Sequence, residues 1–203
     1  MKKYKKKIIV GLTGGPATGK STAVREFKRC GAHIVDADKI ARAILKKGSP
    51  ALRNVAAAFG RTILLPAGEL NRRRMRSIIF KSYDKRKLLE KITHPKIIQV
   101  IKSKLRRYSR GVVVLDAPLL FESEIDNLAD LAVVVEASRK NQISRLKKRD
   151  YINSGQASAM INAQIPITKK IEKADYVIIN NKDVSFVKHQ VKNLYISLKS
   201  RIV

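Results

Sequence analysis

A glycine-rich segment near the start of the chain carries the clearest chemical signature. It reads Gly-Gly-Pro-Ala-Thr-Gly-Lys-Ser, which satisfies the phosphate-loop pattern G-x-x-x-x-G-K-[ST]. Glycines let successive backbone N–H groups turn towards a phosphate, and the positive end of the following helix faces the same anion. We therefore expect a nucleoside triphosphate to be bound by Gly14, Gly15, Pro16, Ala17, Thr18, Gly19, Lys20, Ser21 and Thr22.

Two residues of this loop have more specific tasks. The Lys20 ammonium is expected to reach the β- and γ-phosphates, and the Ser21 hydroxyl is expected to bind Mg²⁺. The surroundings support the pattern, because an apolar run precedes the loop and a helical stretch follows it to about Arg29, before Gly31. A chance glycine-rich turn would not require this context.

Two acids follow the second apolar run of the chain. Asp36 and Asp38 come directly after Ile34–Val35, where a parallel sheet gathers its ligands. A period of two would place both carboxylates on one side of a strand. One of them would accept the proton of a substrate hydroxyl, and the other would orient that hydroxyl or hold metal-bound water. Asp38 could instead cap a helix over Lys39–Leu45.

A third acid, Asp116, ends the apolar run Val112–Leu115. Phosphate-loop enzymes place an acid at this position to orient Mg²⁺, here through water. Many buried strands end in Asp only because a loop begins there. The nearby phosphate loop favours the metal role.

Five short apolar runs supply the elements that must position these residues. They are rich in Val and Ile, lack polar alternation and are separated by stretches of helical spacing, which is typical of a parallel sheet covered on both faces. We predict an α/β fold with one domain over residues 1–203 and a five-stranded parallel sheet flanked by helices. The runs are Ile8–Leu12, Ile34–Val35, Val112–Leu115, Leu131–Val135 and Tyr176–Ile179.

Two insertions interrupt the alternation of strands and helices. Residues 41–110 are too long for one crossover helix and predict a helical lobe, whose basic second half favours an anionic ligand, although a solvated face explains most of the charges. Residues 138–173 predict a lid. Within it, Gln142, Arg145 and Arg149 share one helix face, where arginines would close over a phosphate site.

Composition limits the partners. The net charge is +28, from 44 Lys and Arg against 16 Asp and Glu, and such a field attracts polyanions. Aromatic residues make up only 5% and no base-reading motif occurs, so we expect a polyanionic small substrate or a generally basic proteome rather than nucleic acid. No run approaches the roughly 18 apolar residues of a membrane span, and Met1–Lys7 is charged, so we expect a cytosolic protein.

Taken together, these residues resemble the dephospho-CoA kinase family, which phosphorylates the ribose 3′-hydroxyl of dephospho-coenzyme A with ATP in the last step of coenzyme A biosynthesis. The resemblance covers nearly the whole chain. The phosphate loop alone fits many kinases, whereas the ordered set is specific. Its motifs here include Gly11-Leu12-Thr13-Gly14-Gly15, Val35-Asp36-Ala37-Asp38, Leu70-Asn71-Arg72, His94-Pro95, Pro118-Leu119-Leu120-Phe121-Glu122, Gln142 with Arg145, Arg149-Asp150, Gln164, Lys170 and Asn180.

The resemblance implies roles for residues near the phosphates. Asp38 would be the catalytic base, with Asp36 a possible metal ligand. Arg149 would neutralise charge on the transferring phosphoryl group from the lid. Asn180 would form part of the adenine site. The cofactor would be Mg²⁺, and the substrates ATP and dephospho-coenzyme A.

The acceptor would be bound mainly by the helical lobe. By the same resemblance, Arg72, His94 and Leu119 would contact dephospho-coenzyme A. His94 has a second interpretation, because a histidine before Pro95 could cap and orient the start of a helix.

The phosphate loop departs from the family pattern. The loop has Pro16-Ala17-Thr18 where the family commonly has Ile-Gly-Ser, so one backbone position loses the freedom of glycine.

Three rival functions remain. Adenylate-type or shikimate-type kinases would share the loop, lid and sheet, so the acceptor lobe decides between them and the dephospho-CoA kinases. Asn181-Lys182-Asp183 is one residue short of the guanine-reading Asn-Lys-x-Asp order, which favours ATP over GTP. A nucleic-acid-binding ATPase is permitted by the charge.

Overall fold

The computed structural model describes residues 6–202, so most of the charged start of the chain lies outside it. The chain divides into two compact units. One combines the residues up to Asp36 with those from Leu105 onward, and the other is Ala37–Lys104. The second unit covers most of the insertion expected at residues 41–110.

The first unit contains a five-stranded sheet in the order β2-β3-β1-β4-β5, with every neighbouring pair parallel. The predicted α/β fold is therefore confirmed. The chain leaves β1 towards one edge of the sheet and later continues from β3 towards the other, and such switch points are where parallel sheets bind ligands. The strands are β1 (Lys7–Gly14), β2 (His33–Asp36), β3 (Gly111–Asp116), β4 (Leu131–Glu136) and β5 (Tyr176–Ile179).

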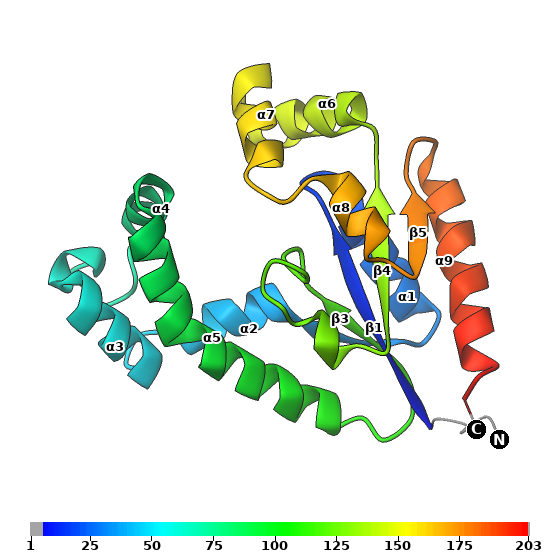
Figure 1. Cartoon of the computed structure of the whole chain (residues 1–203), viewed down its shortest axis with the longest axis horizontal. Helices are drawn as coiled ribbons and strands as arrows, with labels where there is room; N and C mark the ends of the chain where they lie inside the picture. The colour runs from blue at the N-terminus through cyan, green and yellow to red at the C-terminus, as the bar shows by residue number, and fades with distance from the viewer. Residues whose placement is uncertain (1–5, 203) are drawn as a thin grey trace. The chain divides into compact units, whose positions relative to one another are not determined.

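Apolar side chains cover both faces of the sheet whose strands are drawn as arrows in Figure 1. On one face, Phe27 of α1 (Lys20–Arg29) and Val191 of α9 (Val184–Lys199) are fully buried in one cluster with the strands. On the other face, Leu120 packs where a side chain on Gly11 would collide with it. The short helix α8 (Ile167–Glu172) contacts β4 on its way to β5.

The edge strand β5 is partly closed by a side chain. Gln190 Oε1 accepts from the Ile179 N–H at 3.0 Å, and Gln190 Nε2 donates to the Ile179 carbonyl at 2.9 Å. Val177 and Ile179 on this strand remain partly exposed. At Ile179, one amide thus replaces the hydrogen bonds that a further strand would make.

Three helices fill the region predicted to be a lid. They are α6 (Arg139–Asp150), α7 (Ser154–Asn162) and α8. Ser138 caps α6 by accepting from the Asn141 N–H at 3.3 Å. Asn153 and Gln156 form a reciprocal capping box at the start of α7, which fixes where that helix begins.

The second unit is helical and has an apolar cluster of its own, centred on Leu52, Val55, Ile63, Leu70 and Met75. No helix among residues 6–202 is long and apolar enough to cross a membrane. The helices of this unit are α2 (Ala37–Ile44), α3 (Pro50–Phe59), a 3-10 turn at Arg61–Ile63, α4 (Arg72–Lys81) and α5 (Tyr83–Arg106). The last of them, α5, continues past Lys104, where the unit ends.

Candidate active site

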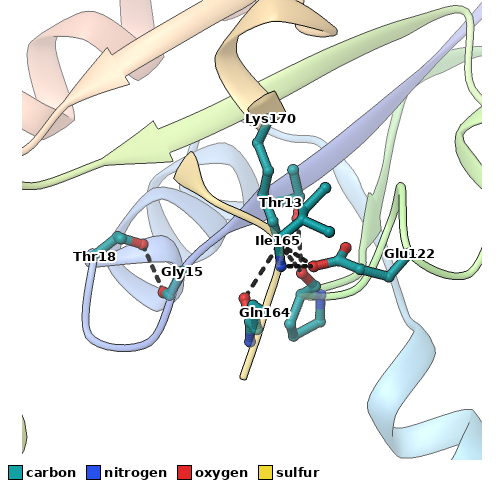
Figure 2. Close-up of polar contacts among 8 residues, drawn as sticks. Thr13, Gly15, Thr18, Glu122, Gln164, Ile165 and Lys170 are labelled. Atoms are coloured by element: carbon teal, nitrogen blue, oxygen red, sulfur yellow. Dashed lines mark hydrogen bonds and ion pairs between the residues drawn. The ribbon is translucent and has the colours of Figure 1, made fainter. Parts of the chain in front are cut away.

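The phosphate loop runs from the end of β1 to the start of α1. Gly19 precedes α1 with a φ of 96°, and a Cβ at this position would overlap the side-chain amide of Asn180. Gly19 offers no side chain to cap the helix, so the first N–H groups of α1 are suited to an anion. Thr18 is buried and folds the loop back: its N–H and hydroxyl donate to the Gly15 carbonyl at 3.3 and 3.0 Å (Figure 2).

Two polar side chains hold the loop from outside. Asn180, just after β5, is buried and donates from Nδ2 to the Thr18 carbonyl at 2.7 Å. Arg145 of α6 donates from Nη1 to the Ala17 carbonyl at 3.3 Å and from Nη2 to the Asn180 carbonyl at 3.1 Å. Because the C=O and N–H of a planar peptide group point in opposite directions, fixing the Thr18 carbonyl turns the Gly19 N–H away from Asn180.

An acid–lysine pair lies beside this loop. Asp116 ends β3, and its Oδ1 pairs with Nζ of Lys20; both side chains are about seven-eighths buried. Asp36 ends β2 and stands opposite Asp116 in the strand register. The structure thus brings together the predicted phosphate-binding lysine and two of the three predicted acids.

The oxygen atoms around this pair fit a magnesium ion. Mg²⁺ prefers hard oxygen ligands, and in nucleotide sites it is completed by waters and phosphates rather than by an all-protein cage. Ser21 is exposed at the start of α1, where its hydroxyl is accessible. Together with the carboxylates of Asp36 and Asp116, it supplies the donor types that such an ion requires.

The third acid occupies a different element from the one expected. The strand β2 ends at Asp36 and α2 begins at Ala37, so Asp38 lies in the first turn of a helix and is exposed. The prediction that a period of two aligns Asp36 and Asp38 on one strand is therefore wrong. The position that precedes the helix, where a cap would stand, belongs to Asp36 and not to Asp38.

The lid face predicted from spacing divides into three different environments. Gln142 is buried and donates to the Ala137 carbonyl at 2.7 Å, whereas Arg145 contacts the phosphate loop. Arg149 is 59% exposed and makes two hydrogen bonds of 2.8 Å to Asp150. The Arg149 guanidinium holds the pKa of the Asp150 carboxyl below its ordinary value. In this arrangement Arg145, and not Arg149, touches the loop.

A basic pocket in the second unit contains Arg72. It has a volume of about 420 Å³ and is lined by Lys46, Lys47, Glu69 and Arg72 with two leucines. Arg72 is the first residue of α4, and its Nη2 donates to the Arg42 carbonyl at 3.3 Å. Three cations against one acid give this pocket a net positive charge, which suits an anionic group.

The other two residues expected to bind the acceptor lie on separate elements. His94 is half-buried in the interior of α5, which continues through Pro95. The alternative that His94 caps the start of a helix is therefore wrong. Leu119 lies in the β3–β4 loop, residues 117–130, and its side chain is 44% exposed.

The fold and the loop define a class of protein. The chain has a phosphate loop after β1, a lysine paired with the acid that ends β3, and the strand order β2-β3-β1-β4-β5. Together these features define a P-loop nucleotide-binding fold. The fold agrees with shikimate kinase from Bacteroides thetaiotaomicron, which superposes with a TM-score of 0.56 at 13% identity over 95% of this chain and 98% of that one.

Within this class, the chain belongs to the dephospho-CoA kinase family. The family's sequence model, described as dephospho-CoA kinase, matches residues 8–185. The chain is 42% identical to dephospho-CoA kinase of Arabidopsis thaliana over 94% of this chain and 84% of that protein, and 40% identical to that of Listeria monocytogenes over 90% and 92%. The structure of dephospho-CoA kinase from Campylobacter jejuni superposes with a TM-score of 0.71 at 26% identity, over 96% and 98%.

The sequence does not reveal the contacts of several residues that surround the loop. Its spacing from Gln142 predicts that Arg145 is a lid arginine facing the phosphate site, but does not predict its hydrogen bond to the Ala17 carbonyl. Glu122 and Lys170 belonged to the family motifs without a role. In the structure they form a buried ion pair of 2.9 Å (Figure 2). A single lysine among many basic residues gave no signal of burial.

Replacing Ala17 with glycine is expected to stabilise the protein by about 0.5–1 kcal/mol without loss of phosphate binding. Ala17 has a φ of 55°, a left-handed conformation that strains a residue with a Cβ. Relief of this strain exceeds the entropy that glycine adds to the unfolded chain. Urea unfolding followed by circular dichroism measures the change. As control, Ala43→Gly at an exposed position of α2 should cost about 1 kcal/mol. A similar loss of unfolding free energy in Ala17→Gly would contradict the claim that Ala17 is strained.

Proposed function

We propose that this chain transfers the γ-phosphoryl group of ATP to the ribose 3′-hydroxyl of dephospho-coenzyme A, in the last step of coenzyme A biosynthesis in the cytoplasm. The observation that carries the proposal is the phosphate loop with Lys20 beside Asp116, in a chain of the dephospho-CoA kinase family. The loop fits the phosphates of ATP. Family membership supports the choice of acceptor.

The donor phosphates would be held by backbone and charge together. The N–H groups from Gly15 to Ser21, except at Pro16, and the start of α1 would bind the β-phosphate, and the Lys20 ammonium would reach the γ-phosphate. Ser21 would hold Mg²⁺, with Asp116 acting through water and Asp36 as a further ligand. The bound ion would neutralise charge on the phosphate oxygens. Asn180 and Arg149 would complete the ATP site, Asn180 near the adenine and Arg149 from the lid.

Asp38 would act as the general base. Its carboxylate would take the proton of the 3′-hydroxyl as that oxygen forms a bond to the γ-phosphorus, while the bond from the phosphorus to the β–γ bridging oxygen breaks and ADP leaves. Asp38 is exposed in the first turn of α2, so its carboxylate is accessible to a substrate. Asp36 is the alternative base.

The acceptor would be recognised beyond its reacting hydroxyl. Dephospho-coenzyme A carries a pyrophosphate, which needs cations other than those that serve ATP. The pocket of Lys46, Lys47 and Arg72 supplies such cations in the second unit. His94 and Leu119 are proposed as further acceptor contacts.

Offered ATP, Mg²⁺ and a panel of hydroxyl compounds, the protein is expected to phosphorylate dephospho-coenzyme A far better than AMP, shikimate or adenosine. Binding energy from the pyrophosphate arm would orient the ribose hydroxyl, so adenosine should lose turnover as well as affinity. Mass spectrometry and phosphorus NMR of the product locate the new phosphate. Preference for AMP or shikimate, or a phosphate on another position, would leave only a P-loop kinase of different specificity.

A variant pair tests the basic pocket in the same assay. Arg72→Ala should raise the KM for dephospho-coenzyme A by about tenfold or more and barely alter ATP binding, because a charged hydrogen bond contributes roughly 1.5–3 kcal/mol. Arg73 is also exposed on α4 but does not line the pocket, so Arg73→Ala is the matched control. Equal effects of the two substitutions would show that only the general charge of the lobe matters.

A further inference from the structure

A lysine is buried at the base of the lid. The side chain of Lys170, on α8, is 1% exposed, although lysine is almost never fully buried unless it is paired. Its Nζ lies 2.9 Å from Glu122 Oε1 and donates to the Pro118 carbonyl at 2.9 Å and to Gln164 Oε1 at 3.2 Å (Figure 2). An ammonium has three N–H donors, so these contacts use its whole capacity.

The three partners come from segments that border the phosphate loop. Pro118 and Glu122 lie in the β3–β4 loop, directly after the strand that ends in Asp116. The Pro118 carbonyl also accepts from the hydroxyl of Thr13 at 2.9 Å, and Thr13 is the residue before the phosphate loop begins. One carbonyl therefore joins the end of β1 to the Lys170 ammonium.

The third partner belongs to the lid. Gln164 lies in the return segment, residues 163–166, which joins α7 to α8. The Ile165 N–H of this segment also donates to Glu122 Oε1, at 3.4 Å. Gln164, Ile165 and Lys170 line a cavity of about 490 Å³ together with Gly15 and Pro16 of the phosphate loop. The ion pair thus lies beside a cavity that two residues of the phosphate loop also line.

Stability alone does not explain this arrangement. Buried ion pairs are often no more stabilising than apolar residues of the same volume, because both charges lose their hydration. The second carboxylate oxygen, Glu122 Oε2, is buried and has no hydrogen-bond partner among the described residues, which adds to that penalty. Hydrogen bonds among three segments do fix the relative positions of those segments, and they do so more precisely than apolar packing, because hydrogen bonds are directional.

We propose that Lys170 is a positioning residue for phosphoryl transfer: its ammonium fixes the lid's return segment against Pro118 and Glu122, and so sets the cavity wall that faces Gly15 and Pro16. Lys170 touches no reacting atom in this role. The inference rests on the proposed kinase function, because a wall beside the phosphate loop matters to a group transferred there.

The first test is Lys170→Met, which keeps the length of the side chain and removes the ammonium. Turnover at saturating substrates should fall by about thirtyfold or more, while the dissociation constant for ATP stays within about threefold. ATP affinity is spared because Asn180 and Arg145 hold the phosphate loop from its other side. The control is Lys169→Met, an exposed neighbour on the same helix, which should leave both constants unchanged. Normal turnover in Lys170→Met would overturn the proposal.

A double variant separates positioning from stability. Lys170→Met alone removes the cation that pairs with the Glu122 carboxylate, so the urea midpoint of this variant should drop; adding Glu122→Leu removes the carboxylate as well and should restore the midpoint. Turnover should remain low in the double variant, because the hydrogen bonds to Pro118 and Gln164 are still absent. If turnover returns together with the midpoint, Lys170 is only structural.

Hydrogen exchange tests the anchoring without any acceptor. Amides of the return segment should exchange faster in Lys170→Met than in the unaltered protein, under conditions where both are folded. Unchanged exchange there would overturn the positioning role even for an enzyme with another acceptor. Faster exchange in a protein that does not phosphorylate dephospho-coenzyme A would instead refute the proposed function and leave the anchor standing.

Discussion

Replacing Lys20 with methionine is expected to lower phosphoryl transfer by about a thousandfold or more while the protein stays folded. The ammonium is expected to stabilise the charge that develops on the β- and γ-oxygens in the transition state, which an apolar side chain cannot do. Methionine keeps most of the aliphatic stem. A coupled ADP assay and single-turnover transfer with labelled ATP measure the loss.

The fold must be checked in this variant, because Lys20 also pairs with Asp116. Far-UV circular dichroism and the urea midpoint show whether Asp116 tolerates the loss of its partner. Lys28→Met, on the exposed side of α1, is the matched control and should transfer normally. Activity of Lys20→Met within about tenfold of the unaltered protein, equivalent to about 1.4 kcal/mol of barrier, would refute the assignment of the phosphate loop.

Asp38→Asn is expected to reduce turnover by about a hundredfold or more and to leave ATP affinity unchanged. The amide matches the shape of the carboxylate but cannot accept the proton of the attacking hydroxyl. Steady-state kinetics with dephospho-coenzyme A give the turnover, and equilibrium binding of a fluorescent ATP analogue gives the affinity. Asp84→Asn, another exposed acid in the first turn of a helix, is the control.

The same change at Asp36 decides between the two acids. Asp36 ends β2 opposite Asp116, so Asp36→Asn should act mainly through the requirement for Mg²⁺ and raise the metal concentration needed for half-maximal rate. Normal transfer by Asp38→Asn with loss in Asp36→Asn would reverse the two roles. Normal transfer by both variants would show that neither carboxylate is the base.

The sheet and the phosphate loop could be predicted because each depends on a local pattern. Runs such as Val112–Leu115 are apolar without alternation and rich in Val, which is typical of a strand buried on both faces. The loop is specified by backbone conformations that few residues allow, as Gly19 shows with its positive φ. Both features can therefore be predicted without knowledge of any tertiary contact.

The side-chain contacts of the site could not be predicted in the same way. Whether Asp38 belongs to a strand or a helix depends on where β2 ends and α2 begins, at Asp36 and Ala37, and no residue of the pattern marks that boundary. Spacing placed Arg145 and Arg149 on the same helix face, but Asp150 holds Arg149 while Arg145 reaches the loop. Competition between neighbouring partners decides such contacts, and periodicity carries no information about it.

The amide of Gln190 has a consequence for the protein in concentrated solution. An apolar edge strand with free N–H and C=O groups recruits strands from other chains, which is a common start of aggregation. β5 would be open to this, since Val177 and Ile179 are partly exposed beside those groups. Gln190 occupies both backbone groups of Ile179. Its side chain must therefore be displaced before another chain can extend the sheet at that residue. The Gln190 side chain thus hinders the pairing of β5, a strongly β-forming edge strand, with strands of other molecules.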